Sequence, residues 1–114
     1  MILNQTTKKI ISKNEKYCQG FFSQALGLIF SPRKNLIMEF PQEQKISLHN
    51  FLVFYPLEIL ILDQNKRVIE IKKNFLPFTF YNPQNKGKYV VELGKEESKG
   101  KVRVGELLKI IILI

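Results

Sequence analysis

Short apolar runs separated by polar turn residues dominate the sequence, a pattern that is typical of β-strands rather than helices. Each run is short enough for one strand. The predicted strands are Leu36 to Phe40, Ile46 to Phe54, Leu57 to Leu62, Val68 to Ile71, Tyr89 to Leu93 and Leu107 to Leu113. Ahead of them, Ile2 to Asn4 and Lys9 to Ile11 flank a turn-like tetrapeptide and predict an opening hairpin.

One stretch has a helical period. From Gly20 to Leu26 the apolar residues are one, three and four positions apart, which predicts a short helix. The tetrapeptide Asp63 to Lys66 predicts a tight hairpin between two strands. Residues Ile46 to Leu62 are apolar on both alternating faces, so we expect central strands that are covered on both sides. The pattern predicts a mainly β sandwich or partly closed barrel with one short helix.

Composition supports one globular domain over residues 1–114. A chain of 114 residues is long enough to bury one continuous core but too short for two independent ones, and 45% hydrophobic residues exclude the composition of a disordered chain. Polar residues among Met1 to Lys9 do not resemble a secretory signal, and the apolar tail is shorter than the roughly 20 residues that span a bilayer. The single cysteine, Cys18, cannot form a disulfide within the chain. We expect a soluble cytoplasmic protein without membrane insertion.

The formal net charge of +8 is concentrated rather than spread evenly. Residues 66–88 contain six Lys or Arg and one Glu, and residues 1–16 contain four Lys and one Glu. Residues 48–65 contain two acidic residues and no Lys or Arg. A basic segment of this kind suits nucleic-acid contact, although a high lysine content can also serve solubility alone.

Three stretches follow one another in an order that resembles a known family. They are ALGLIF at residues 25–30, LHNFLVFYPLEI at 48–59 and KYVVEL at 88–93. Shorter matches are LD at 62–63, FLPF at 75–78 and VGE at 104–106. Together they resemble the domain of unknown function 192, a family of small uncharacterised bacterial and archaeal proteins, and the central stretch is similar to its archaeal version. The resemblance implies a β-sandwich of jelly-roll type and brings no assigned activity.

The chain departs from the family pattern at four positions. Leu26 stands where an arginine usually precedes the glycine, and Ser31 stands where a basic residue often follows. Glu58 and Glu106 stand where aspartate is commoner. A site that depends on the arginine would therefore be altered or absent in this chain.

Few residues offer catalytic or metal chemistry. One His and one Cys are too few for a zinc site within the monomer, and no phosphate-binding loop motif occurs. Ser23 or Ser47 could be combined with His49 and Glu58 into a nucleophile, base and acid, but no nucleophile-elbow sequence supports such a triad. We predict no catalytic residue, no cofactor and no metal.

The polar residues His49, Asn50 and Glu58 stand within strongly apolar sequence, where burial without a partner would be costly. Two interpretations stay open. His49 could be a core histidine bonded to a carbonyl or to Glu58, with the Glu58 carboxylate reaching solvent. Alternatively, the three residues line a pocket and bind a small polar ligand, since a turn at Tyr55-Pro56 could bring His49 and Glu58 together.

The leading functional prediction is a non-catalytic β module that binds a small molecule or a protein. The alternative is weak binding of single-stranded nucleic acid by the basic segment, in which aromatic residues would stack on bases. An enzyme of unknown class comes third. The residues predicted to contact nucleic acid are Lys66, Arg67, Lys72, Lys73, Phe78 and Tyr81.

Overall fold

A computed structural model describes residues 1–19, 35–49, 56–94, 98 and 100–112. Within these ranges the chain forms only strands and their connections. The strands are β1 (Ile2–Asn4), β2 (Ile10–Ser12), β3 (Glu15–Gln19), β4 (Asn35–Gln44), β5 (Leu48–His49), β6 (Leu57–Leu62), β7 (Val68–Phe75), β8 (Phe80–Tyr81), β9 (Gly87–Gly94) and β10 (Leu108–Ile110). The helix predicted at residues 20–26 lies outside the described residues.

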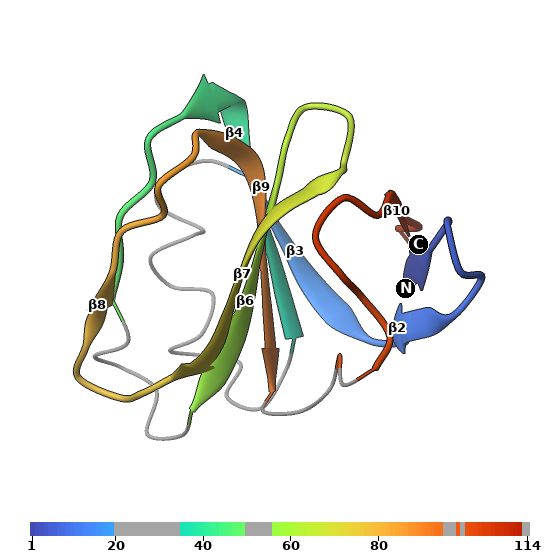
Figure 1. Ribbon diagram of the computed structural model, residues 1–114, viewed down its shortest axis with the longest axis horizontal. Coiled ribbons are helices and arrows are strands. Elements are labelled where there is room, and N and C mark those ends of the chain that lie inside the picture. Colours follow the sequence, from blue (N-terminus) through green and yellow to red (C-terminus); the bar gives the residue numbers. More distant parts are fainter. Residues whose placement is uncertain (20–34, 50–55, 95–97, 99, 113–114) are drawn as a thin grey trace.

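The strands form three layers. A five-stranded sheet in the order β3-β4-β9-β6-β7 stands in the middle, with β3 and β4 parallel and the other neighbours antiparallel. The pair β5-β8 lies on one side and the sheet β10-β1-β2 on the other, as Figure 1 shows from left to right. Among the described strands, β3 and β7 are the outer strands of the large sheet, and Val68 at the start of β7 also hydrogen-bonds with Gly105 and Glu106. The mainly β fold is therefore a layered sandwich rather than a closed barrel.

The five-stranded sheet is apolar on both faces because all six residues of β6 are buried. Cross-strand pairs share a face, so Ile59 lies beside Glu92 on one face and Glu58 beside Leu93 on the other. We call the two apolar clusters the first core and the second core. The first core comprises Leu36, Met38, Ile46, Leu48, Leu57, Ile59, Ile61, Phe75 and Val90. The second core comprises Ile2, Ile11, Ile37, Leu60, Leu62, Val68, Tyr89, Val91, Leu93 and Leu108.

Two predicted turns are confirmed. β1 and β2 form the opening antiparallel hairpin. β6 and β7 are joined by the predicted hairpin, in which the Lys66 N–H donates to the Asp63 carbonyl at 3.0 Å. The Asp63 Oδ1 also accepts the backbone N–H groups of Asn65 and Arg67, each at 2.9 Å. The side chain of Asp63 thus satisfies the amides that the tight turn leaves unpaired.

The strand predictions hold best for the apolar runs. β6 has the predicted bounds, and β4, β7 and β9 extend beyond them. Of the run predicted from Ile46 to Phe54, only Leu48–His49 forms a described strand, and residues 50–55 lie outside the described part. β3 and β8 were not predicted, because Glu15–Gln19 is mostly polar and Phe80–Tyr81 is only two residues long.

The apolar tail is part of the fold. β10 pairs with β1 antiparallel, and its Leu108 is buried in the second core. The buried Asn4 holds the preceding loop, since its Nδ2 donates to the Lys101 carbonyl at 2.7 Å and to Glu106 Oε1 at 3.0 Å. The prediction that this tail forms a strand is confirmed for Leu108–Ile110.

Candidate binding site

Glu58 is buried on β6. It is 4% exposed and points toward the second core, where Leu93 is its cross-strand neighbour. Its Oε1 accepts the backbone N–H of Ser98 at 3.4 Å. The carboxylate therefore has a hydrogen-bond donor from the segment that leads into β10.

The other two residues of the predicted site are described only in part. His49 pairs through its backbone with Phe80, and the preceding Leu48 packs into the first core. The side chain of His49 and all of Asn50 lie outside the described residues. The strand that carries His49 thus covers the first core, whereas Glu58 faces the second. Their association in one site stays a prediction.

The two ends of the basic segment 66–88 make contacts within the fold. The Nζ atoms of Lys66 and Lys88 each lie 5.2 Å from the centre of the Tyr89 ring, a distance suited to cation–π attraction. The Arg67 guanidinium donates to the Gly105 carbonyl at 2.6 Å. Two of the predicted nucleic-acid contacts, Lys66 and Arg67, therefore also bind the protein's own ring or backbone.

The middle of the segment gathers around Glu70 on β7. The Tyr81 hydroxyl donates to Glu70 Oε2, and the backbone N–H and Nδ2 of Asn85 donate to Glu70 Oε1 at 3.0 Å each. Partial burial would raise the pKa of Glu70, but these hydrogen bonds outweigh it and lower the pKa. Burial and the neighbouring Glu70 together raise the pKa of the Tyr81 hydroxyl. Tyr81 is thus held in place by the fold.

Of the remaining predicted contacts, Lys73 and Phe78 are exposed and Lys72 is half-buried. Lys72 Nζ lies 5.9 Å from the centre of the Tyr81 ring, and Lys73 is exposed on the same strand. Phe78 is 61% exposed and has a φ of 62°, a left-handed conformation that is rare for a bulky residue. Of the two predicted aromatic contacts, Phe78 therefore presents more ring surface than the half-buried Tyr81.

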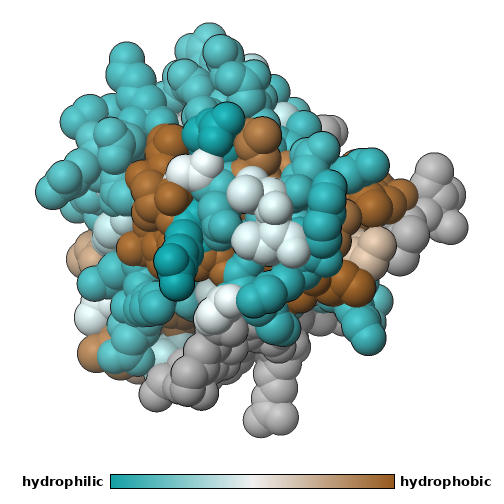
Figure 2. Space-filling model, turned by 45° about the vertical axis from the view of Figure 1, so that its right-hand side comes forward, coloured by the Kyte–Doolittle hydropathy of each residue, from teal (hydrophilic) through white to brown (hydrophobic). Residues whose placement is uncertain are grey.

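A shallow cavity of about 300 Å³ lies where β3 approaches the chain after β10. Lys13, Glu15 and Tyr17 line one side, and Ile110 to Ile112 line the other. On the exposed face that carries this region, hydrophilic side chains divide the apolar surface into separate strips (Figure 2). The cavity has the volume of a small ligand site.

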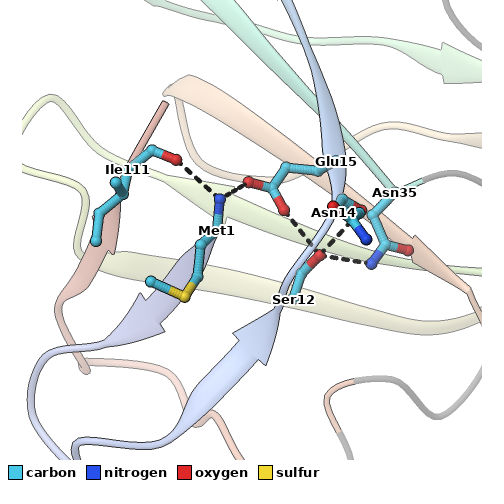
Figure 3. Close-up of polar contacts among 6 residues, drawn as sticks. All are labelled: Met1, Ser12, Asn14, Glu15, Asn35 and Ile111. Atoms are coloured by element: carbon cyan, nitrogen blue, oxygen red, sulfur yellow. Dashed lines mark hydrogen bonds and ion pairs between the residues drawn. The ribbon is translucent and has the colours of Figure 1, made fainter. Parts of the chain in front are cut away.

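The polar groups beside this cavity bind one another (Figure 3). Asn35 Nδ2 donates to Ser12 Oγ at 2.7 Å, and Ser12 Oγ donates to Glu15 Oε2 at 2.9 Å. The Met1 ammonium pairs with Glu15 Oε1 and donates to the Ile111 carbonyl at 2.8 Å. This chain of hydrogen bonds joins the five-stranded sheet to the three-stranded one. We interpret it as a structural clamp, because its carboxylate is already paired.

Glu92 on β9 is different. It is 6% exposed and shares its face with the first core, between Leu36 of β4 and Ile59 of β6. Its Oε2 is buried and receives no hydrogen bond from any residue that the structure describes. Burial raises the pKa of the carboxyl to about 7. A buried carboxylate without a hydrogen-bond donor lowers the stability of the fold by several kcal/mol. A functional role would explain why such a residue is present in a core strand.

Glu92 is not among the site residues predicted from the sequence, although it has the same sequence signal as Glu58. Glu92 is a lone acidic residue in the run Tyr89 to Leu93, just as Glu58 is in Leu57 to Leu62. The alternation of β9 places Tyr89, Val91 and Leu93 on one face and Val90 with Glu92 on the other. Since both faces of this central strand are covered, a charged residue on either face is buried.

In the described part of the chain, metal ligands do not cluster and no helix could span a membrane. Within it, no three His, Cys, Asp or Glu residues come together as a metal site would require. None of its elements is a helix of the length and apolar character needed to cross a membrane.

Solved structures share this fold. A protein of Sinorhizobium meliloti, provisionally described as a transcription regulator, superposes with a TM-score of 0.73 at 18% identity over 82% of this chain and 78% of its own. A protein of unknown function from Novosphingobium aromaticivorans superposes with a TM-score of 0.75 at 17% identity over 84% of this chain and 74% of its own. At these identities the likeness concerns the fold alone.

Sequence comparison gives the family. The UPF0127 protein of Pyrococcus horikoshii is 30% identical over 95 residues, which cover 81% of this chain and 82% of that protein. The UPF0127 protein of Thermococcus sibiricus is 29% identical over 96 residues, again 81% of this chain, but the match spans only 62% of that longer protein. The profile of DUF192, described as uncharacterized ACR, matches residues 3–110. The chain therefore belongs to the DUF192 family, as its three ordered stretches predict.

Proposed function

We propose that this protein is a non-catalytic β module that binds a small molecule beside Glu92. The observation that carries the proposal is the buried Glu92 Oε2, which has no hydrogen-bond donor among the described residues. A donor from a bound molecule would supply the missing interaction. Sites of this kind combine an apolar lining with a few fixed polar groups, and Leu36, Ile59 and Val90 provide that lining here.

The position of Glu92 along its strand favours access. β9 ends at Gly94, two residues further on, and Gly94 places no side chain on the same face. A molecule entering from the end of the strands would pass Leu57, the buried cross-strand partner of Gly94 on this face, rather than the centre of the sheet. This location supports a ligand site at the end of the first core.

The predicted residues His49 and Asn50 enter the same proposal. β5 packs on the first core through Leu48, and the chain after His49 leads to β6, whose first residue Leu57 pairs with Gly94. We therefore propose His49 and Asn50 as further contacts of the ligand. Glu58 lies on the other face, and we retain it as a separate proposed contact near Ser98.

A fragment screen followed by ligand-observed NMR tests the proposal. We expect fragments that bind the unmodified protein and lose at least tenfold in affinity with Glu92→Gln, which keeps the side-chain shape. Glu43→Gln is the matched control, because Glu43 is an exposed carboxylate on β4. Fragments that bind Glu92→Gln and the unmodified protein equally well, or a screen without binders, would refute the proposal.

A second proposal is weak, nonspecific binding of single-stranded nucleic acid by the segment 66–88. The exposed Phe78 and Lys73 support it, since an aromatic ring and a cation are the groups that stack on bases and neutralise phosphates. Titration of a labelled single strand at two salt concentrations tests it. We expect weak, salt-sensitive binding that falls with Phe78→Ala, and binding that is insensitive to salt would contradict the proposal.

We also propose a cytoplasmic location. The single cysteine supports it, because secreted domains of this size commonly rely on disulfides.

A further inference from the structure

We propose that the ligand of the Glu92 site is a small primary amine, bound as its ammonium ion with a short apolar group attached. This inference rests on the proposed function, since it names the chemical class of the molecule at the same site.

Charge complementarity favours a cation. The described side chains nearest to Glu92 across the sheet are Leu36 and Ile59, and Val90 lies two residues away on the same face. None of these three side chains can titrate or donate a hydrogen bond. An ionised Glu92 would thus be a buried negative charge among aliphatic groups, and a bound ammonium would neutralise it. A neutral donor such as an alcohol would satisfy the oxygen but leave the charge uncompensated.

The buried oxygen without a donor favours a compact ammonium over other cations. A guanidinium binds best when both carboxylate oxygens accept a parallel pair of N–H groups, whereas an ammonium can direct one N–H to one oxygen. The buried unpaired atom is Oε2. A metal ion would need further ligands, and the described residues do not bring three His, Cys, Asp or Glu together. One N–H donor on a compact cation fits this arrangement.

The surroundings favour an apolar group on the amine. From Glu92 the same face continues through Val90, flanked by Leu36 and Met38 on β4 and by Ile59 and Ile61 on β6. An alkyl group next to the ammonium would contact aliphatic side chains rather than water. Ammonia itself would lack this contact and bind more weakly than an alkylammonium.

Titrations of the whole chain with three four-carbon probes test the inference. The probes are n-butylammonium, n-butanol and butyrate, followed through the amide resonances of Glu92 and Gly94 at pH 8. We expect only butylammonium to saturate these shifts, at least tenfold more weakly with Glu92→Gln and unchanged with Glu43→Gln. Because the ionised carboxylate is the binding form, affinity should fall at pH 5.5. The protein's net charge of +8 acts against nonspecific attraction of the amine.

The outcomes separate the two proposals. Butanol binding as tightly as butylammonium would refute the amine class, and so would butylammonium binding equally to Glu92→Gln. If the fragment screen yields neutral binders that depend on Glu92, the binding site stands and the amine inference falls. If no fragment and no probe depends on Glu92, both fall. Thermal unfolding of each variant without probe checks that the loss of binding is not a loss of folding.

Discussion

Glu58 and Glu92 are the same residue type on adjacent strands, but they lie on opposite faces of one sheet. β6 and β9 pair antiparallel, and both carboxylates are more than nine-tenths buried. Glu58 accepts the Ser98 amide, whereas Glu92 Oε2 has no donor among the described residues. The residue, the strand type and the burial are alike, so the difference comes from what packs on each face.

On the second-core face, a neighbouring segment supplies a hydrogen-bond donor to the buried carboxylate. Ser98, which precedes β10, brings a backbone N–H to Glu58. The first-core face around Glu92 presents aliphatic side chains from β4 and β6. A buried acid is therefore tolerated where a neighbouring loop satisfies it, and it stands out as a candidate site where none of the described neighbours does.

The largest expected effect is that leucine substitutions at Glu92 and Glu58 change the free energy of unfolding in opposite directions. Glu92→Leu should raise the free energy of unfolding at pH 8 by roughly 3 kcal/mol, since it removes a carboxylate whose pKa is raised from 4.5 to about 7. Glu58→Leu should lower it by about 1–3 kcal/mol, because the Ser98 N–H loses its acceptor. Urea unfolding of both variants measures the two changes.

The unmodified protein and the Glu43→Gln variant provide the reference curves for these experiments. Equal destabilisation by the two leucine variants would show that Glu92 has a stabilising partner after all. A stabilised Glu92→Leu variant that no longer binds butylammonium would connect the cost of the buried carboxylate with its function.

The pH dependence of the unfolding free energy should show the contribution of the Glu92 carboxyl directly. The Glu92 carboxyl titrates near 4.5 when unfolded and near 7 when folded, so it favours folding fully below pH 4.5. That contribution is lost as the pH rises through 7, and it amounts to roughly 3 kcal/mol. We expect the difference in unfolding free energy between the unmodified protein and Glu92→Gln to change by this amount between pH 4 and pH 8.

Taking the difference between the two proteins removes the contribution of other groups. Glu70, for example, has a lowered pKa and therefore favours folding as the pH rises, which is the opposite trend. Urea midpoints at several pH values give the curve. Parallel curves for the two proteins would mean that Glu92 titrates alike in the folded and unfolded states.

The fold was predictable where local pattern and burial agree. Leu57–Leu62 reads as a strand covered on both sides because every residue but Glu58 is apolar, and all six are buried. Asp63 predicts its hairpin because its side chain can accept the amides of the turn. β3 was not predictable because Glu15–Gln19 is mostly polar, and its strand structure depends on its parallel pairing with β4.

The candidate site was less predictable than the fold. Sequence identifies Glu58 and Glu92 as acids in apolar runs, but it does not say which of them receives a backbone amide. That depends on Ser98, which lies 40 residues after Glu58. The role of His49 and Asn50 stays a prediction. Side-chain partners supplied by distant segments are the information that a single sequence lacks.

The clamp between the sheets should show the smallest effect and should leave the first-core face unchanged. Ser12 Oγ is buried and accepts Asn35 Nδ2 at 2.7 Å, so Ser12→Ala leaves that amide without its acceptor. We expect a loss of about 1–2 kcal/mol in urea unfolding, because Glu15 keeps its pairing with the Met1 ammonium. Ser47→Ala, at an exposed serine, is the control and should change stability by less than about 0.5 kcal/mol. Since Ser12 and Asn35 lie on the side of the second core, Ser12→Ala should retain the pH dependence and the butylammonium affinity of the unmodified protein. A change in either would show that the two faces of the sheet are coupled through Asn35 and the Gly94 amide, which donates to Asn35 Oδ1 at 3.2 Å.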